Sequence, residues 1–271
     1  MDRLTHFLQR FDLRAQVLHD GPLPTPLIVP RSSLGAMLHV VFAGAFELRL
    51  ARKRTPLHAP AAVFLARPAA HSVVAAGDTD AVLLSAAIAF GRGDENPLLQ
   101  GMPHPLVMAG NDLDDVGPLL GMLSAEAEGR RCGHATLIER LSEALVIRLL
   151  RMSIETRTVD AGVIAGLAEP RLAKALTAMH ASPEAQWDLD HLAAIAGMSR
   201  SRFAGLFTEV LGMPAGEYLR AWRIGLAKRM LRAGRPVKAV AADVGYGSSM
   251  AFSRAFSQVV GASPRRWLSA N

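Results

Sequence analysis

The sequence has one cysteine, few charged residues and no long apolar segment. The one cysteine, Cys132, excludes a disulfide framework or a multi-cysteine zinc module and is consistent with a reducing compartment. The longest apolar run, around residues 81–90, is far shorter than the ~20 residues needed to span a bilayer. The charged N-terminus has no continuous apolar stretch behind it, so we expect no signal peptide, no membrane association and a cytoplasmic location.

The small share of charged residues also excludes some classes of protein. Only 20% of the 271 residues are charged and 50% are hydrophobic, which excludes a disordered protein and suits two domains of ordinary size. The net charge of +6 is unevenly distributed: residues 170–271 hold 14 Lys and Arg against 6 Asp and Glu, whereas residues 1–169 hold 16 against 18. A basic domain beside a near-neutral one indicates a polyanion-binding module joined to a second function.

The first third of the chain alternates short apolar runs with Gly, Pro and charged breaks. Phe46, Leu48 and Leu50 alternate with Glu47 and Arg49, which is the period of a half-buried strand. Regular short strands with proline-rich breaks favour a small β-barrel, which we place in residues 1–110. The expected strands cover residues 37–42, 45–50, 62–65, 71–74 and 81–84.

The apolar pattern becomes helical near Asp112. Two helices are expected in residues 111–152, either packed on the barrel or forming a homodimer seam. Their apolar positions are Val116, Leu119, Leu120 and Leu123 in the first helix and Leu137, Ile138, Leu141, Leu145, Leu149 and Leu150 in the second. Residues 153–168 show no clear periodicity and are interpreted as an interdomain linker.

The most specific signal is a pattern that occurs twice in residues 169–271, which read as helical throughout. Each copy has a short Ala-rich helix, a glycine (Gly197 or Gly245), a turn that ends on an expected N-cap serine (Ser199 or Ser248), and a longer helix. In both longer helices the apolar residues occupy one face and leave the opposite face free. This is a helix-turn-helix twice over, a motif whose second helix commonly reads DNA.

The free faces of the two longer helices predict contact with DNA. Small and hydroxyl side chains let a helix enter a major groove, and arginine binds guanine or phosphate. A generic helical bundle is the alternative, but it explains neither the duplication nor the lack of carboxylates. The first face carries Arg200, Ser201, Arg202, Ala204, Gly205 and Thr208, and the second carries Ser249, Met250, Ala251, Ser253, Arg254 and Gln258.

One long helix is expected between the two copies, over residues 214–233. Its length of about 27 Å would hold two recognition helices close to one duplex turn apart. Its basic residues match no single stripe and are expected to contact phosphates rather than bases: Arg220, Arg223, Lys228, Arg229 and Arg232.

Residues 169–268 resemble the AraC/XylS transcriptional regulators. The resemblance rests on the segments 192–203 (LAAIAGMSRSRF), 218–223 (YLRAWR), 244–256 and the closing 261–267 (GASPRRW). It implies seven helices and a monomer that inserts both recognition helices into adjacent major grooves. Carried over by position, the base-reading residues would be Ser201, Ala204 and Gly205, then Ser249, Met250, Ala251 and Arg254, and Arg266 is expected to contact phosphate.

The N-terminal part resembles the cupin-type sensory domain found in one branch of that family. The similar segments are residues 38–44 (LHVVFAG) and 96–103 (NPLLQGMP). The chain departs from the branch at residues 60–62, where a Gly-Asp turn is usual, and at Phe46, where a cysteine is common. The resemblance implies a small-molecule effector for this domain, with redox and metal signals as further options.

Three side chains in this half carry alternative hypotheses. His39 and His71 lie on predicted strands and would converge inside a barrel, which suits a metal ion, although a third ligand and the His-x-His pattern of cupin metalloenzymes are missing. Cys132 follows Arg130 and Arg131, which favour a reactive thiolate. A metal-dependent enzyme or metal sensor and a thiol-based sensor therefore stay open beside satisfied structural roles.

Together these observations predict an α+β protein. We expect a cupin-like β-barrel with two following helices, then an all-α double helix-turn-helix domain. The expected function is sequence-specific DNA binding in transcription regulation rather than catalysis, because no nucleophile–base set or phosphate-binding loop stands out. The expected partners are double-stranded DNA, RNA polymerase, an effector and a second copy of the chain, with activation and repression both open.

Overall fold

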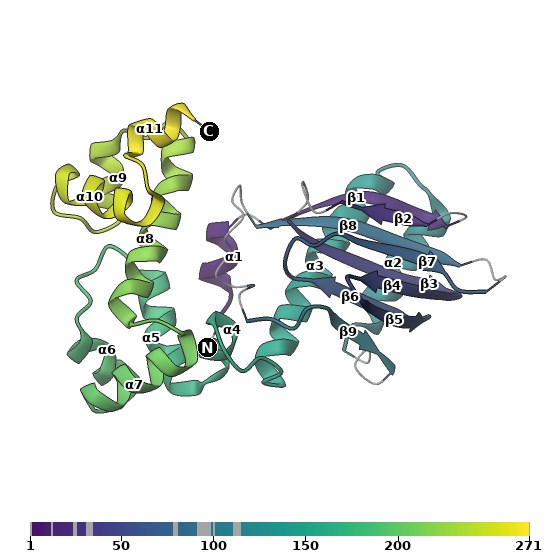
Figure 1. Ribbon diagram of the computed structural model, residues 1–271, viewed down its shortest axis with the longest axis horizontal. Coiled ribbons are helices and arrows are strands. Elements are labelled where there is room, and N and C mark those ends of the chain that lie inside the picture. Colours follow the sequence, from purple (N-terminus) through teal and green to yellow (C-terminus); the bar gives the residue numbers. More distant parts are fainter. Residues whose placement is uncertain are drawn as a thin grey trace. The chain divides into compact units, whose positions relative to one another are not determined.

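A computed structural model describes residues 2–11, 13–23, 26–30, 35–77, 81–90, 99, 101–110 and 115–270 (Figure 1). The chain divides into two compact units. Residues 12–159 form a unit that holds the strands, and residues 1–11 together with 160–271 form a second unit that contains helices and their connections. The predicted α+β organisation is therefore confirmed.

Two antiparallel sheets build the first unit, which we call the barrel unit. The five-stranded sheet has the order β1-β8-β3-β6-β9 and the four-stranded sheet has the order β2-β7-β4-β5. The first sheet comprises β1 (Leu13–Pro22), β8 (Val82–Phe90), β3 (Ala36–Ala43), β6 (Ala61–Leu65) and β9 (Leu106–Ala109). The second comprises β2 (Leu27–Val29), β7 (His71–Ala75), β4 (Ala45–Leu50) and β5 (Lys53–His58).

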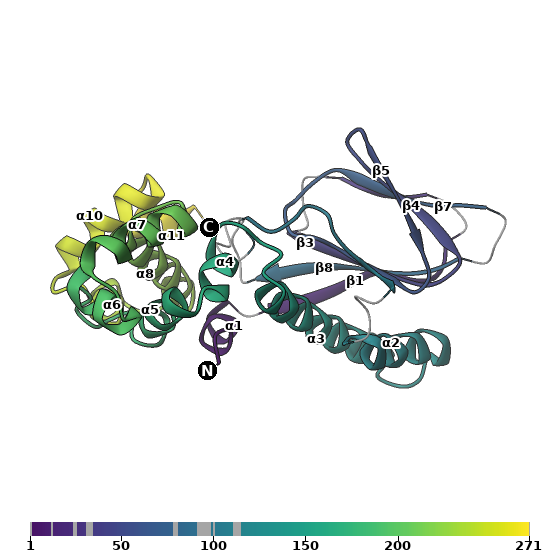
Figure 2. The same cartoon turned by 90° about the horizontal axis from the view of Figure 1, so that it is seen from below.

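The core of the barrel unit lies between the two sheets, which face each other (Figure 2). Phe46 and Leu48 of β4 are fully buried and Arg49 between Leu48 and Leu50 is exposed, so the predicted alternation is confirmed. Val63 of β6 in the other sheet belongs to the same core. The five predicted strands are present, and β1, β2, β5 and β9 are additional.

Two helices, α2 (Gly117–Gly129) and α3 (His134–Glu155), complete the barrel unit. They run along the outside of the five-stranded sheet, where α3 packs on β1 and β8 (Figure 2). Leu141, Leu145 and Leu149 are buried there, as predicted for packing on the barrel. Leu137 is a correction: it lies at the margin of the apolar stripe and its side chain is 42% exposed.

The second unit, which we call the helical unit, contains α1 and α4 to α11. Its helices from Pro170 onward number seven, as the resemblance implies. The bounds are α1 (Thr5–Phe11), α4 (Val163–Ala168), α5 (Pro170–Ala181), α6 (Leu189–Ala196), α7 (Arg200–Leu211), α8 (Ala215–Arg232), α9 (Val237–Asp243), α10 (Ser249–Val260) and α11 (Pro264–Ser269).

Two predicted domain limits differ from the structure. Residues 1–11 belong to the helical unit and not to the barrel unit. Leu4, just before α1, and Phe7 of α1 are buried, and Arg3 Nη1 donates to the carbonyl oxygen of Leu167 at 2.7 Å. The predicted linker 153–168 begins inside α3 and ends with α4, in which every residue is buried. The segment between these two helices is residues 156–162.

Some predicted features lie outside the described residues. These are residues 96–98 and 100 of the cupin-like segment and residues 111–114 at the first domain limit. Among the helices of the described ranges, none combines the length and the apolar character that crossing a membrane requires.

Candidate nucleic-acid interface

The first helix-turn-helix consists of α6, a short turn and α7. The turn begins at Gly197, whose positive φ of 64° is a left-handed conformation that glycine adopts without strain. The amide of Met198 then donates to the carbonyl of Ala193 at 2.9 Å and closes the end of α6. Ser199 starts α7, because its hydroxyl accepts the amide of Arg202. The predicted N-cap is confirmed, and it fixes the direction in which α7 leaves the turn.

The second helix-turn-helix, α9 and α10, repeats these contacts. Gly245 has a φ of 80°, and the amide of Tyr246 donates to the carbonyl of Ala241 at 2.8 Å. The turn is one residue longer than the first, and Ser248 accepts the amide of Ala251 at the start of α10. The two turns thus begin with the same backbone hydrogen bond and end on a serine N-cap, and the predicted duplication is present in the structure.

Aromatic side chains form the core beneath each longer helix. Under α7, Phe203 contacts Phe207 and Phe207 contacts Tyr218 of α8, with ring centroids 5.5 and 5.7 Å apart. Under α10, Phe252 contacts Phe256 and Phe256 contacts Trp267 of α11 at 5.6 and 5.7 Å. All four phenylalanine side chains are fully buried, which holds the inner face of α7 and of α10 in place and leaves the outer face exposed.

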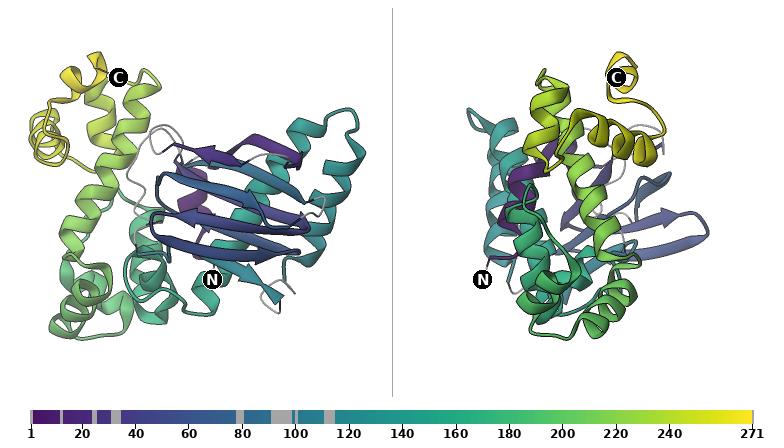
Figure 3. Two further views of the ribbon diagram at one scale, coloured as in Figure 1. Left: turned by 45° about the vertical axis from the view of Figure 1, so that its right-hand side comes forward. Right: turned by 90° about the vertical axis from the view of Figure 1, so that its left-hand side faces the viewer.

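A single helix, α8, lies between the two motifs of the helical unit (Figure 3). It has 18 residues, which corresponds to about 27 Å of helix. Tyr218, Trp222 and Leu226 are buried along one side, as predicted. Because α8 packs on α7 as well as on α9, α10 and α11, both motifs share one support.

The structure brings the predicted DNA-contacting residues to the exposed sides of α7 and α10. Ala204, Ser249 and Ser253 are half-buried at the margins of these faces. Met250 is 67% exposed, which is unusual for a large apolar side chain, and no residue of α10 carries a carboxylate. The exposed members are Arg200, Ser201, Arg202, Gly205 and Thr208 on α7, Met250, Ala251, Arg254 and Gln258 on α10, and Arg266 on α11.

Two of these arginines have neighbours within the unit. Arg200 Nη1 lies 3.1 Å from a carboxylate oxygen of Asp190 on α6, and both side chains are mostly exposed. Arg254 Nη2 lies 3.7 Å from the sulfur of Met250, one helical turn away. Exposed ion pairs contribute little to stability, so Arg200 can exchange its carboxylate for another anion. The Met250–Arg254 contact places an apolar side chain and a cation side by side on the outer face of α10.

The basic residues of α8 correct the sequence prediction. Arg223 donates from Nε to the carbonyl of Pro183 at 2.6 Å and from Nη2 to the carbonyl of Ala185 at 2.8 Å. Its guanidinium therefore ties the segment between α5 and α6 to α8, and the predicted phosphate contact is wrong for this residue. Lys228 and Arg232 lie over the ring of Trp267, at 5.9 and 4.7 Å from its centroid.

The remaining basic residues of α8 divide between two roles. Arg229 Nη1 donates to the carbonyl oxygen of Gln9 in α1 at 3.2 Å, so it too serves a contact inside the helical unit. Arg220 is exposed. Four of the five basic residues of α8 thus have partners inside the helical unit, and a phosphate contact stays a prediction for Arg220.

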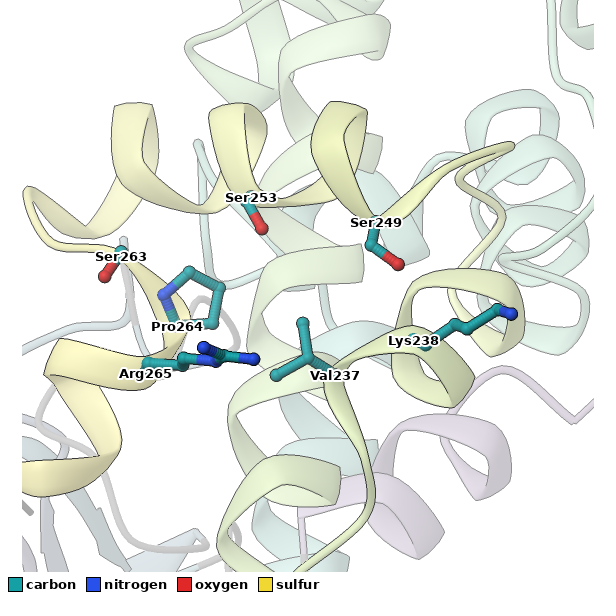
Figure 4. A pocket seen from close by; sticks show the side chains of 7 residues that line it. All are labelled: Val237, Lys238, Ser249, Ser253, Ser263, Pro264 and Arg265. Carbon is teal, nitrogen blue, oxygen red and sulfur yellow. The ribbon is translucent and has the colours of Figure 1, made fainter.

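A surface pocket beside α10 includes two cations that the sequence did not single out. It has a volume of about 320 Å³ and lies between α9, α10 and α11 (Figure 4). Lys238 lies two residues after Pro236, which precedes α9. Arg265 directly follows Pro264, the first residue of α11. A cation within two residues of a proline at a helix start is the sequence signal that could have identified both residues. The lining residues are Val237, Lys238, Ser249, Ser253, Ser263, Pro264 and Arg265.

The barrel unit brings His39 and His71 together, as predicted. Their Nε2 atoms lie 2.9 Å apart in the interior, between β3 of one sheet and β7 of the other. His71 Nδ1 faces the carbonyl of Ala69 at 2.8 Å and must donate to it, while His39 Nδ1 lies 2.9 Å from the Ser85 hydroxyl. Two neutral imidazoles satisfy this chain, with the Ser85 hydroxyl and His39 Nε2 as donors.

Burial explains why both imidazoles are neutral. It lowers the pKa of His39 to about 3, with His71 contributing, and it also lowers the pKa of His71 against the raising effect of the Ala69 carbonyl. The pKa of the nearby His104 is lowered by burial, by Arg67 and by His71. In the described parts of the chain, no three His, Cys, Asp or Glu side chains are placed to share one metal ion. The described side chains do not fit a resident metal ion, because each ring nitrogen of His39 and His71 has a partner and a third ligand is lacking.

The third residue singled out in this half is Cys132. It lies between α2 and α3 as a free and exposed thiol. No second cysteine exists in the chain to form a disulfide with it. A redox role for Cys132 stays a prediction.

Comparison with known proteins supports both units. A family model described as a helix-turn-helix domain matches residues 192–270, and one described as a cupin matches residues 2–155. An AraC-like transcription regulator of Streptomyces antibioticus is 36% identical over 190 residues, which cover 68% of this chain and 62% of that protein. The HTH-type transcriptional regulator AlkR of Acinetobacter baylyi is 31% identical over 178 residues, covering 64% of this chain and 58% of that protein.

Part of the chain is also similar to a solved structure. The DNA-binding domain of AdpA, a global transcriptional factor whose crystal structure includes a target DNA, is 30% identical and covers 37% of this chain and 91% of that one, with a TM-score of 0.35. The chain spans about three fifths of the length of the curated relatives it matches.

Proposed function

The chain belongs to the AraC-type helix-turn-helix proteins that carry an N-terminal cupin domain, and from this we propose that it is a cytoplasmic, sequence-specific DNA-binding regulator of transcription. In this proposal α7 and α10 each enter a major groove of the same duplex. The barrel unit serves as the sensor of a small molecule and as the contact to a second copy of the chain. The chain has no catalytic role, in keeping with relatives that are named transcription regulators.

One observation carries the proposal: two N-capped helices, preceded by turns that open with the same backbone hydrogen bond, pack on one supporting helix, and each has an exposed outer face. The outer faces have arginine, hydroxyl and small side chains, and α10 has no carboxylate. This composition lets a helix backbone approach base edges while its arginines reach bases or phosphates. The length of α8, about 27 Å, is close to the ~34 Å that separates successive major grooves on one side of a duplex.

Two of the exposed groups have distinct roles in this proposal. Arg254 reads a base next to Met250, whose apolar side chain suits a thymine methyl group. Arg266, exposed on α11, contacts the backbone and carries no sequence information. The proposal also includes binding of RNA polymerase. Whether the bound protein activates or represses transcription is a question for experiment.

The experiment is selection of DNA ligands from a random pool, followed by fluorescence anisotropy titration of the selected duplex and of an unrelated one. We expect a preference for the selected sequence and a log–log salt slope of about −0.9 for every phosphate contacted. A selection that enriches no sequence, or binding that is indifferent to salt, would contradict the proposal. Sedimentation of the protein without DNA tests whether the chain forms a homodimer. A monomer at micromolar concentration would contradict this part of the proposal.

A further inference from the structure

The pocket between α9, α10 and α11 has a chemistry of its own. Figure 4 shows the Ser249 and Ser253 side chains projecting from α10 on one side and the Arg265 guanidinium extending across the opposite side. Lys238 extends along the outer edge from α9. Pro264 and Val237 form the apolar floor between them. No carboxylate is among the residues that line the pocket.

Among the described residues, four polar side chains of this pocket lack protein partners, whereas the hydroxyl of the fifth, Ser263, accepts the amide of Arg266 at the start of α11. Within the part of the chain that the structure describes, Lys238 and Arg265 form no ion pair, and the hydroxyls of Ser249 and Ser253 form no hydrogen bond. Both cations are exposed, whereas the two serines are half-buried. The guanidinium of Arg223, by contrast, donates hydrogen bonds to two backbone carbonyls. Two uncommitted cations and two uncommitted hydroxyls form a donor set that fits an anion with several oxygen atoms, as a phosphate group has.

The position of the pocket relative to α10 identifies the source of that phosphate. Ser249 and Ser253 are one turn apart and define one flank of α10, while Met250 and Arg254, also one turn apart, define the adjacent outer face. When the outer face enters a major groove, a DNA backbone passes along the flank of the helix. The pocket lies on that flank.

We propose that this pocket binds a phosphodiester of the DNA strand that borders the groove entered by α10. The inference rests on the proposed DNA-binding function. Lys238 and Arg265 supply the charge, and Ser249 and Ser253 donate from their hydroxyls. Ser249, which the family resemblance places among the base readers, then contacts the backbone. The site fixes the register of α10 on the duplex without reading sequence, and base reading by this helix is left to Met250, Ala251 and Arg254.

The test uses Lys238→Ala and Arg265→Ala in the full chain, with Lys53→Ala and Arg52→Ala as controls. Arg52 and Lys53 are exposed at the β4–β5 turn of the barrel unit, and each control substitution removes one positive charge, as the pocket substitutions do. We expect each pocket variant to weaken binding to the selected and to the unrelated duplex by about fivefold alike, and to reduce the magnitude of the salt slope by about 0.9. The control variants should change neither the affinity for the two duplexes nor the salt slope. Pocket variants that match the controls, or a loss confined to the selected duplex, would overturn the proposal.

A second measurement locates the phosphate. A duplex with one neutral methylphosphonate linkage is prepared for each position of the site in turn. A neutral linkage at one position should weaken DNA binding by the wild type. It should not change DNA binding by the Lys238→Ala/Arg265→Ala variant, because that variant has already lost the interaction. If no position behaves in this way, the pocket does not hold a backbone phosphate. If the wild type binds no duplex at all, the proposed function has failed rather than the pocket alone.

A third arm separates DNA from free phosphate. Inorganic phosphate is titrated into the protein at constant ionic strength, with tryptophan fluorescence and thermal unfolding as readouts. We expect no saturable effect at millimolar phosphate. Saturable stabilisation that the double variant abolishes, combined with unchanged DNA binding, would assign the pocket to a small phosphorylated ligand and overturn the proposal. Circular dichroism of each variant confirms that the exposed substitutions leave the fold intact.

Discussion

The ring of Phe7 packs on the indole of Trp222, with centroids 5.1 Å apart, so the N-terminal helix α1 is part of the core of the helical unit. Phe7 is fully buried and also lies edge-on to His180 of α5 at 5.9 Å. Two hydrogen bonds flank Phe7 in the sequence. The guanidinium of Arg3 donates to the carbonyl oxygen of Leu167, and the guanidinium of Arg229 on α8 donates to the carbonyl oxygen of Gln9 on α1. The helix α8, which supports both helix-turn-helix motifs, therefore depends on α1 for part of its packing.

Replacing Phe7 by alanine should destabilise the helical unit by about 3–5 kcal/mol, because a fully buried aromatic side chain is lost. Urea unfolding monitored by tryptophan fluorescence measures this unit alone, since Trp187, Trp222 and Trp267 are the three tryptophans of the chain and all lie in it. Gln9→Ala, at an exposed position of the same helix, is the control and should change stability by less than about 0.5 kcal/mol. Equal stabilities of the two variants would show that α1 does not belong to this core.

The two turn glycines should respond differently to alanine. A Cβ at Gly197 meets no atom within 4 Å, so Gly197→Ala carries only the left-handed backbone penalty of about 1–2 kcal/mol. A Cβ at Gly245 would lie 2.7 Å from the carbonyl oxygen of Glu184, so Gly245→Ala should be worse by at least about 1 kcal/mol. Thermal unfolding followed by fluorescence compares the pair. A smaller loss for Gly245→Ala than for Gly197→Ala would contradict the close approach of the Glu184 backbone to this turn.

Substitution of Arg254 should alter sequence preference. Arg254→Ala is expected to weaken binding to the selected duplex by about 1–3 kcal/mol and to relax the preference at one base pair, because a base contact is lost. Arg266→Ala should instead weaken binding to all sequences alike. Competition titrations with single-base variants of the selected site separate the two results. If Arg254→Ala lowers affinity for every duplex equally, Arg254 contacts the backbone rather than a base.

The buried imidazole pair predicts that the barrel unit loses stability in acid. The pKa of His39 is lowered from 6.5 to about 3 in the folded chain, chiefly by burial. Above pH 6.5 the imidazole is neutral in both the folded and unfolded states, and between pH 6.5 and about 3 only the unfolded state gains the proton. Stability should therefore fall with decreasing pH in that window, by up to about 1.4 kcal/mol per pH unit for one histidine.

Hydrogen exchange of peptides from β3 and β7 measures that loss, because the barrel unit has no tryptophan to report on it. His39→Gln should be less stable than the wild type at neutral pH but show a shallower dependence on pH, since one titrating group is gone. His58→Gln, at an exposed position on β5, is the matched control and should retain the full dependence. An unchanged pH dependence in His39→Gln would mean that His39 is not the group that titrates.

The strands that the sequence predicts are the central ones. β3, β4, β6, β7 and β8 each have neighbours on both sides, whereas β1, β9, β2 and β5 are the four edges of the two sheets. An edge strand has fewer neighbours to bury it, so its sequence need not be an apolar run. β5 illustrates this with Lys53, Arg54 and Pro56 in six residues. Apolar periodicity therefore detects the interior of each sheet and not its margins.

The helical unit is more predictable, because caps and periodicity act locally. The serines and glycines at the turns fix α7 and α10 from neighbouring residues alone. The position of α1 depends instead on contacts with residues far along the chain, and no local pattern encodes them. The same limit applies to the cations: Arg223 and Arg265 are alike in the sequence, but one bonds two backbone carbonyls and the other is exposed at the pocket.

The membership of α1 in the helical unit has a consequence for synthesis of the protein. Arg229 donates to the carbonyl of a residue 220 positions earlier, so α1 is synthesised long before the helix α8 with which it packs. Leu4 and Phe7 remain without their packing partners while the entire barrel sequence is translated, although domains generally fold as they emerge. A nascent chain of intermediate length thus displays a short apolar helix ahead of a folded barrel, a species suited to capture by chaperones. The helical unit is completed only after its last helix, α11, has been synthesised.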